Sequence, residues 1–441
     1  MTTAIVGGTV VTVDDDFTLH DRGWVLVDGE HIVGVGTGAA PSADTVIDAH
    51  GCAVMPGMIN AHTHLFQTLF RGLGDDKSLL DWLRDYIWPA ASHMTAADMH
   101  AAAMLGLAEN LLSGATTVID HQYIHADTGS SDAVLRAADQ LGIRLTLAYG
   151  WADRNYHLPL VQTAQQVVER AGTLRTAWAG HRRIDIGLAP LIPWGCSDDA
   201  MSTTVAAARA WGAPLHTHCA ETTVEVDMSI NERGMRHVPW LASHNCLGPD
   251  VQLAHSVWLD DAELDLIAST GSVVVHAPVS NMYLASGVAR VPAMRTRGIS
   301  VALASDGPGS NNRQDLFEVL KTTVLLQKVH HLDPVILRPE DALIMMCRGG
   351  AAALGRSADL GRLAPGAVAD VTIVDLMSPF VSPVHRVPSA LVFNCSPANV
   401  RHVLVNGEVV VDGGRLVNAE LAAVVATATD ACRDLFARAN L

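Results

Sequence analysis

Apolar and polar positions in the central part of the chain follow two alternating periods. Short Val-, Ile- and Leu-rich runs typical of buried strands recur between residues 53 and 307. Segments with helical spacing lie between them, for example 96–114 and 131–142, and both of these end in glycine. The predicted strands are 53–64, 115–122, 143–150, 184–190, 214–221, 251–256, 272–278 and 299–307. Eight strands alternating with helices predict an α/β fold of the (β/α)8 TIM-like barrel type. A doubly wound sheet is the alternative, but no Gly-rich phosphate loop follows the first strand.

The two ends of the chain have a different pattern. Residues 1–55 and 370–417 contain Val-rich runs broken by Asp-Gly and Asn-Gly turns, which is typical of antiparallel strands. The final stretch, 419–441, has the pattern of a terminal helix. We therefore predict a small β-sandwich domain composed of residues 1–55 and 358–441. The barrel is predicted to span residues 56–357.

Composition limits the class of protein. A length of 441 residues suits one barrel of about 250 residues with a smaller module. The net charge of −17 disfavours nucleic acid as a partner. Seven scattered cysteines without a CxxC pair are typical of reduced thiols in a cytoplasmic protein. We recognise neither a signal peptide nor an apolar run long enough for a membrane span, so we expect a soluble cytoplasmic protein.

Polar side chains gather at the C-terminal ends of the predicted strands. In a barrel these ends meet at one mouth, where active sites lie. His62 and His64 are two residues apart on a strand, so both face the same side and can chelate one metal. With His218 and Asp306 from later strands they form a set of three imidazoles and one carboxylate. That set suits one Zn²⁺ per chain, with Fe²⁺ as the alternative.

Several motifs resemble those of a known family. The segments MPGMINAHTH (55–64), HTHCAET (216–222), LAHS (253–256) and SDGPGSNN (305–312) resemble the amidohydrolase superfamily. Within it they are similar to the atrazine chlorohydrolase, melamine deaminase and guanine deaminase-like branch, which is related to cytosine deaminase. The resemblance implies that the metal ligands are His62, His64, His218 and Asp306. It also implies that Glu221 is the acid/base carboxylate and that His255 orients the attacking water.

The distribution of lysine bears on the number of metal ions. Binuclear members of the superfamily use a carboxylated lysine on a middle strand to bridge two metals. This chain has no lysine between Lys77 and Lys321, so the middle strands cannot supply that bridge. We therefore expect a mononuclear site. His216 also faces the strand side that carries His218, and we interpret it as a core residue or a support for the ligands.

Together with this residue set, the resemblance implies a metal-dependent aminohydrolase that acts on C–N bonds other than peptide bonds in cyclic amidines. Glu221 would protonate a ring nitrogen, Asp306 would accept a proton from the attacking water, and His255 would hydrogen-bond that water or the developing oxyanion. The amino group of an N-heteroaromatic ring (purine base, pterin, pyrimidine or s-triazine) would leave as ammonia. An alternative is release of chloride or an alkylamine from an s-triazine. A non-catalytic relative is disfavoured because every expected ligand is present.

Substrate contacts are expected from the loops over the mouth. Gln67 can hydrogen-bond to a lactam or amidine edge, and Trp82 can stack on a flat ring. Trp194 follows the fourth predicted strand and can line the pocket, and Asn281 lies in a loop that resembles the substrate loop of the branch. Leu191 stands near the position where adenosine-type deaminases of this group carry a histidine, which favours a bare base, a pterin or a triazine over a nucleoside. The resemblance also implies a homodimer or larger assembly.

Overall fold

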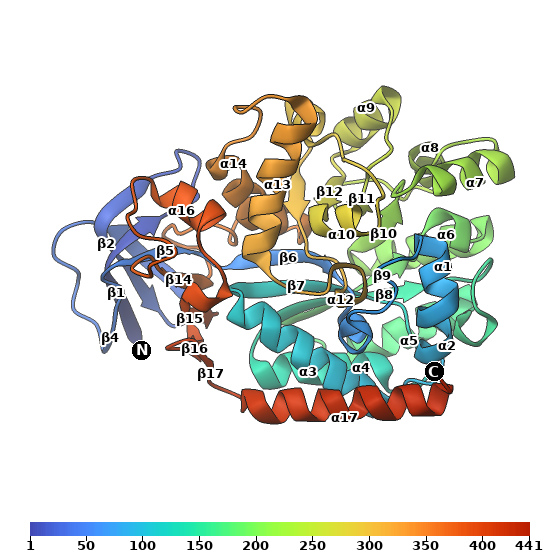
Figure 1. The fold of residues 1–441 in the computed structure, drawn as a ribbon, viewed down its shortest axis with the longest axis horizontal. Helices are drawn as coiled ribbons and strands as arrows, with labels where there is room; N and C mark the ends of the chain where they lie inside the picture. The colour runs from blue at the N-terminus through green and yellow to red at the C-terminus, as the bar shows by residue number, and fades with distance from the viewer.

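The computed structural model describes all 441 residues, and eight parallel strands form its centre (Figure 1). Each strand pairs in parallel with the strand before it, in sequence order from β6 to β13. The strands are β6 (Met58–Thr63), β7 (Ala115–Gln122), β8 (Arg144–Trp151), β9 (Ile184–Pro190), β10 (Leu215–Cys219), β11 (Val251–His255), β12 (Val273–His276) and β13 (Val301–Leu303). The predicted α/β barrel is therefore confirmed, and each of the eight predicted strands overlaps one of these.

The last strand, β13, meets the first, β6, through a few polar contacts that close the barrel. The Asp306 amide donates to the His62 carbonyl at 3.1 Å, and the Ser305 amide donates to Asn60 Oδ1 at 3.0 Å. The Asn60 amide nitrogen donates in turn to Gln314 Oε1 at 3.2 Å. These contacts hold the end of β13 against β6, so that Asp306 lies beside the two histidines of β6.

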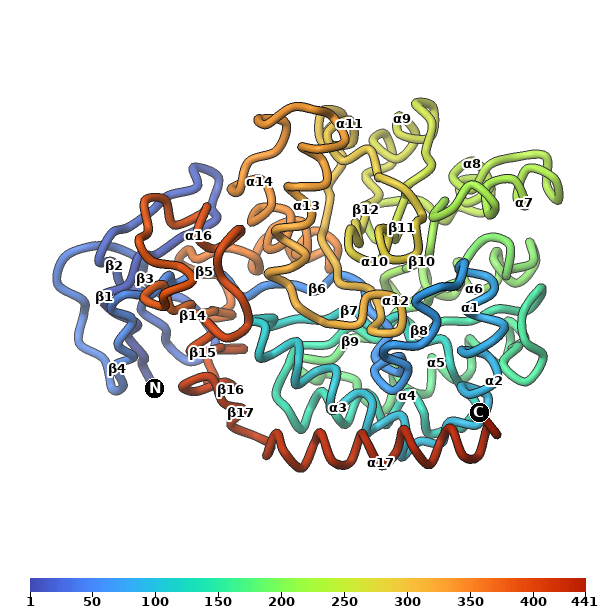
Figure 2. Tube along the Cα trace, in the orientation of Figure 1, coloured from blue at the N-terminus to red at the C-terminus, as the bar shows by residue number.

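Strands from both ends of the chain pair in a second, mixed sheet. Figure 2 shows the N-terminal and C-terminal segments side by side at the left of the molecule. Residues from both segments line a separate buried core, which includes Ile5, Val27, Ile373 and Leu404. The strands are β1 (Thr2–Val11), β2 (Leu19–Asp28), β3 (His31–Gly36), β4 (Thr45–Asp48), β5 (Cys52–Pro56), β14 (Val371–Asp375), β15 (Val400–Val405), β16 (Glu408–Asp412) and β17 (Arg415–Leu416).

The first predicted strand, 53–64, is two strands in two different sheets. β5 pairs with β1 and β14 in the terminal sheet, whereas β6 pairs with β7 in the barrel. Gly57 separates them, and a Cβ there would lie only 2.2 Å from the Thr116 side chain. The close approach of Thr116 therefore requires glycine at the point where the chain passes from one sheet to the other.

Helices surround the barrel, and the C-terminal helix runs along the outside of the molecule, at the bottom of the view (Figure 1). α17 lies along α3, where Arg438 forms an ion pair with Asp98 and Leu435 is buried. The α-helices are α1 (Leu79–Trp82), α2 (Trp88–Ala91), α3 (Ala96–Leu112), α4 (Ser130–Leu141), α5 (Ala164–Ala177), α6 (Asp198–Trp211), α7 (Thr223–Arg233), α8 (His237–Ser243), α9 (Asp261–Thr270), α10 (Pro278–Tyr283), α11 (Val291–Thr296), α12 (Pro308–Asn311), α13 (Leu316–His331), α14 (Pro339–Ile344), α15 (Gly350–Ala353), α16 (Val387–Phe393) and α17 (Leu421–Ala439).

The shorter helical turns are the 3₁₀ helices η1 (Leu65–Phe70), η3 (Leu158–Leu160), η4 (Pro193–Gly195) and η6 (Pro397–Asn399), and the π-helical turns η2 (Leu83–Ile87) and η5 (Met345–Gly349). All seven cysteines are unpaired, and every one except Cys432 is buried. None of the helices combines the length and the apolar composition that a membrane span needs.

Candidate active site

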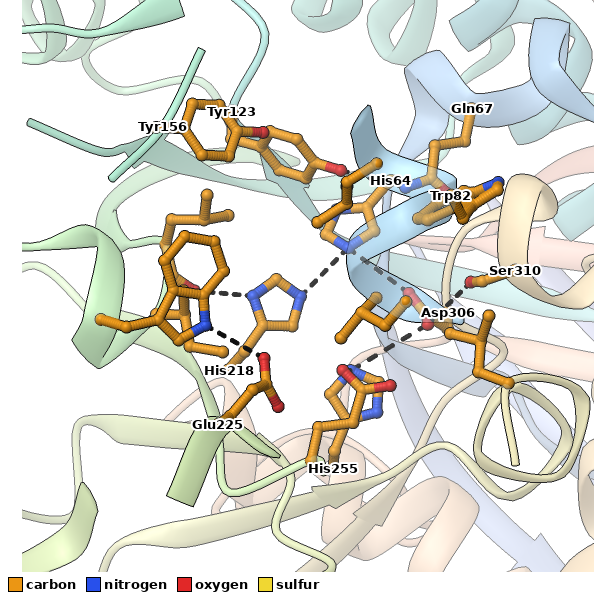
Figure 3. A pocket seen from close by; sticks show the side chains of 17 residues that line it. His64, Gln67, Trp82, Tyr123, Tyr156, His218, Glu225, His255, Asp306 and Ser310 are labelled. Carbon is orange, nitrogen blue, oxygen red and sulfur yellow. Dashed lines mark hydrogen bonds and ion pairs between the residues drawn. The ribbon is translucent and has the colours of Figure 1, made fainter. Parts of the chain in front are cut away.

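Three imidazoles and one carboxylate converge at the C-terminal mouth of the barrel. His64 Nε2 lies 3.2 Å from His218 Nε2 and 3.4 Å from Asp306 Oδ1. His62 Nε2 lies 3.3 Å from the same carboxylate oxygen. Figure 3 shows His64, His218 and Asp306 pointing toward one another at the base of a cavity. The structure thus brings together the four residues that the sequence suggested as metal ligands.

Hydrogen bonds at the other ring nitrogens fix how two of these imidazoles present their lone pairs. His64 Nδ1 donates to the His121 carbonyl at 2.7 Å, and His218 Nδ1 donates to the Leu191 carbonyl at 2.6 Å. A backbone carbonyl can only accept, so each Nδ1 carries the proton and each Nε2 carries a free lone pair. His62 Nε2 is buried and has no hydrogen-bond partner. These nitrogens are therefore ready to bind a cation.

The spacing and charge of this group fit a divalent metal. With ligand bonds of about 2.0–2.1 Å, the donor atoms of a tetrahedral zinc site lie roughly 3.3–3.4 Å apart. The distances of 3.2, 3.3 and 3.4 Å between neighbouring donors agree with that edge length. Burial lowers the pKa of His62 and of His218, and it lowers the pKa of His64 to about 3, so the imidazoles are neutral at pH 7. Neutral imidazoles and an ionised carboxylate are the donors that such an ion requires.

Asp306 is held as a carboxylate by its surroundings. Burial opposes its ionisation, but the facing histidines outweigh burial and keep the pKa of Asp306 well below its usual range. The hydroxyls of Ser280 and Ser310 donate to Oδ2 at 2.6 and 2.9 Å, and the Gly307 amide donates to Oδ1 at 2.6 Å. Asp306 has a φ of 64°, a conformation that non-glycine residues adopt only where their surroundings enforce it.

Glu221 and His255 lie next to these three imidazoles and the carboxylate. His255 Nε2 is 3.5 Å from Glu221 Oε2 and 4.0 Å from Asp306 Oδ2. Burial raises the pKa of Glu221 to about 7, so its carboxyl is partly protonated at neutral pH. Burial alone would lower the pKa of His255, but the nearby Glu221 and Asp306 carboxylates outweigh it and raise the pKa. The Ser286 hydroxyl donates to Glu221 Oε1 at 3.0 Å and fixes the direction of that carboxyl group.

A cavity opens above these residues, with a volume of about 480 Å³ including its mouth. Three of the four residues suggested from the sequence as substrate contacts line it, namely Gln67, Trp82 and Trp194. The Gln67 amide nitrogen donates to Tyr123 Oη at 3.1 Å, and Oε1 is buried without a partner. The fourth residue, Asn281, is not among the lining residues. Its side-chain oxygen faces His255 instead.

The other strand-end histidines lie outside the cavity lining. His121 is buried with its ring 4.7 Å from that of His218, and neither of its ring nitrogens has a partner. His276 is also buried without a partner. His216 lies behind His62, with its Nε2 2.7 Å from His62 Nδ1.

Sequence reasoning missed several lining residues. They are Leu79, Leu83, Tyr123, Tyr156, Ile192, Glu225, Leu284 and Ser310. Two had a usable signal, because Tyr123 lies two residues beyond His121 along the same extended segment and Glu225 lies four residues beyond Glu221, in the first turn of α7. Tyr156 follows β8 in a loop, where no periodicity indicates which side chain turns inward.

Comparison with known proteins agrees with this geometry. Residues 53–410 match the model of the amidohydrolase family. The chain is 37% identical over 434 residues to a 5′-deoxyadenosine deaminase of Methanosarcina mazei, which covers 98% of each chain. It is 35% identical over 450 residues to a 5-methylthioadenosine/S-adenosylhomocysteine deaminase of Halobacterium salinarum, which covers 100% of this chain and 99% of the relative.

Solved structures of similar fold include zinc proteins. An adenosine deaminase from Xanthomonas campestris with bound zinc has a TM-score of 0.93 and 28% identity, and the match covers 98% of each chain. An atrazine chlorohydrolase from Arthrobacter aurescens complexed with zinc has a TM-score of 0.93 and 27% identity. That match covers 98% of this chain and 100% of the other.

Proposed function

This chain belongs to the amidohydrolase family, and we propose that it is a zinc-dependent deaminase that acts on the adenine ring of a nucleoside. One observation carries the proposal. His62, His64, His218 and Asp306 converge with neighbouring donor atoms 3.2–3.4 Å apart, which is metal-binding spacing, and the buried carboxyl of Glu221 lies beside them. The deaminase names of relatives that match this chain over its whole length support the same reaction.

The four ligand residues would hold one divalent metal, and such a metal lowers the pKa of water toward about 7 and makes hydroxide available at neutral pH. The absence of lysine from the middle strands supports a single ion. Zinc-bound neighbours in the fold comparison support zinc.

The protein's own groups divide the proton transfers between them. Asp306, which is ionised, accepts a proton from the attacking water. Glu221, in its protonated form, donates to a ring nitrogen, and the neighbouring ring carbon becomes electrophilic. His255, in its doubly protonated form, donates from Nδ1 to Asn281 and from Nε2 to the incoming oxygen as charge develops on it. The neighbouring Glu221 and Asp306 carboxylates favour that form by raising the pKa of His255. The tetrahedral carbon then expels its amino group, which takes up the proton held by Asp306 and leaves as ammonia. The added hydroxyl returns its proton to Glu221, and the ring keeps an oxo group.

The cavity lining supports a neutral substrate. No lysine or arginine lines the cavity, and five of its residues are leucine or isoleucine: Leu79, Leu83, Leu191, Ile192 and Leu284. A phosphate or carboxylate group on the substrate would enter this space without a lysine or arginine to pair with, and Glu225 would repel it. We therefore propose adenine nucleosides whose 5′ group is uncharged, which fits 5′-deoxyadenosine better than a nucleotide.

The residue at position 191, a leucine, affects whether the cavity can bind a ribose. The sequence suggested a substrate without ribose because this position lacks a histidine, whereas the relatives are named for nucleosides. The Leu191 side chain lines the cavity while its carbonyl orients His218. We propose that the sugar packs against Leu191 and its apolar neighbours, and that no imidazole forms a hydrogen bond with the sugar at this position.

Hydrolytic dechlorination of an s-triazine is the second candidate. The atrazine chlorohydrolase in the fold comparison supports it, because the same catalytic groups can expel chloride. The two candidates differ in the product released.

Both candidates can be tested on purified, zinc-loaded protein. Ammonia release would be measured with 5′-deoxyadenosine, 5′-methylthioadenosine, adenosine, adenosine 5′-monophosphate, adenine, guanine and melamine, and chloride release would be measured with atrazine. We expect ammonia from the uncharged nucleosides and at least 100-fold lower kcat/KM for the monophosphate, as roughly expected for an unpaired buried charge. Ammonia from the bare bases alone would reject the nucleoside proposal, and chloride without ammonia would favour the second candidate.

A further inference from the structure

His62 differs from the other two histidine ligands in what orients it. His64 and His218 donate from Nδ1 to backbone carbonyls, whereas His62 Nδ1 faces another side chain, His216. We propose that His216 and Gln252 are positioning residues, which set the tautomer and direction of His62 so that its Nε2 lone pair faces the metal. This inference rests on the metal site of the proposed function.

The geometry is that of a continuous hydrogen-bonded chain. His62 Nδ1 and His216 Nε2 are 2.7 Å apart, and the two ring planes differ by only 7°. A near-planar arrangement aims the N–H of one ring at the in-plane lone pair of the other. His216 Nδ1 lies 3.1 Å from Gln252 Oε1, and Gln252 Nε2 donates to the Ala353 carbonyl at 2.6 Å.

The Ala353 carbonyl determines the direction of every bond in the chain. Because a carbonyl only accepts, the Gln252 atom facing it must be the NH₂ group, and Oε1 must face His216. His216 Nδ1 must then carry a proton, so its Nε2 can only accept. His62 Nδ1 therefore donates, and the lone pair of His62 is left on Nε2. The reverse tautomer would set two acceptors against each other between His216 and Gln252.

Because these three side chains are buried, the orientation of His62 depends on its hydrogen-bond partners within the protein. Exposed fractions are 0% for His62, 1% for His216 and 2% for Gln252, so bulk water does not replace a lost partner. The Ala353 carbonyl is at the end of α15, where helical carbonyls lack an intrahelical donor and are free to accept. The chain thus links the helix end at Ala353 to the ligand His62. Partners of this kind fix the tautomer of metal-binding histidines and raise their basicity.

Substitutions at both positions test the proposal. His216→Leu removes the acceptor, Gln252→Leu removes the group that fixes the tautomer of His216, and His216→Gln keeps an acceptor at a similar reach. Leu253→Ala is the matched control, because Leu253 is buried beside Gln252 but belongs to the outer core between strands and helices. Zn²⁺ affinity of the metal-free proteins would be measured by competition with a chromophoric chelator. The visible spectrum of the Co²⁺ forms would report ligand geometry.

We expect zinc affinity to fall roughly 10- to 100-fold in His216→Leu and about 10-fold in Gln252→Leu, with altered cobalt spectra in both. His216→Gln should stay within about threefold of wild type, and Leu253→Ala should lose thermal stability but keep its zinc affinity. If His216→Leu does not fold, Gln252→Leu and His216→Gln still decide the matter.

Wild-type affinity in both leucine variants would overturn the positioning role, as would an equal loss of affinity in Leu253→Ala. Failure of the wild-type protein to bind zinc would instead reject the metal site of the proposed function, so the two failures are distinguishable.

Discussion

The side-chain oxygen of Asn281 accepts a hydrogen bond from Nδ1 of His255 at 2.9 Å. The other ring nitrogen, Nε2, faces Glu221 and Asp306. His255 has a φ of 66°, so its backbone is also held in a rare conformation at the end of β11. Asn281, in the second half of α10, thus acts on the active site through His255.

Loss of this hydrogen bond should reduce turnover more than binding. In Asn281→Leu the His255 ring can rotate or change tautomer, and we expect kcat to fall roughly 10- to 100-fold while KM changes less than about threefold. Asn281→Asp keeps an acceptor at the same place and should retain more of the wild-type kcat. Steady-state kinetics on both variants decide the matter. An increase in KM alone would show that Asn281 contacts substrate directly.

Glu221→Gln should abolish turnover but leave the metal in place. Glutamine has nearly the same shape but cannot donate a carboxyl proton, so we expect kcat to fall by about 10³-fold or more. Metal content by elemental analysis should match the wild-type protein. Glu263 offers a control, because it is a buried carboxylate in the cap of α9, outside the cavity. Glu263→Gln should lower Tm and leave kcat unchanged, and a wild-type kcat in Glu221→Gln would remove Glu221 from the mechanism.

The raised pKa of Glu221 predicts an alkaline limb in the pH profile. Burial raises this pKa to about 7, and only the protonated carboxyl donates to the ring. The protonated fraction falls as the pH rises through 7, so kcat/KM should decline by about tenfold per unit well above that pH. An ordinary carboxyl would already be ionised near pH 5 and would give no such limb. A profile that stays flat from pH 6 to 9 would contradict this assignment.

Removal of the metal should remove both activity and part of the stability. His62, His64, His218 and Asp306 bring three nitrogens and a carboxylate close together in a buried space, and a bound ion stabilises the folded state by mass action. Dialysis against a chelator should lower Tm and abolish ammonia release, and added Zn²⁺ should restore both. His62→Ala should bind less than about one tenth of the wild-type metal. Full metal occupancy in that variant would exclude His62 as a ligand.

A buried ion pair joins the barrel to the terminal sheet. Arg144, at the start of β8, lies 3.2 Å from Asp370, and both side chains are almost fully buried. Asp370→Ala leaves the guanidinium without its carboxylate, and we expect the free energy of unfolding to fall by about 3–5 kcal/mol. Urea titration of the metal-loaded protein measures this change. The double variant Arg144→Leu/Asp370→Leu should recover part of the loss, because no unpaired charge remains.

Local patterns in the sequence predicted much of the fold. Short apolar runs separated by amphipathic segments predicted all eight barrel strands, and the two-residue spacing of His62 and His64 placed both on one face. Tyr156 and Leu284 could not be predicted as cavity residues, because side chains in loops and short helices have no period that shows their direction.

The sequence by itself determined which chemical groups the protein contains: the histidines, the Asp306 carboxylate and a glutamate three residues after His218. It also determined that the middle strands contain no lysine. These are properties of residue type and local spacing. Tertiary structure alone decided that Glu221 is buried beside His255, that Asn281 faces this histidine, and that His62 is oriented through His216 by the Ala353 carbonyl. Tautomers, pKa values and ligand distances depend on which groups from distant strands meet in a space without water, and only the closed barrel brings those groups together.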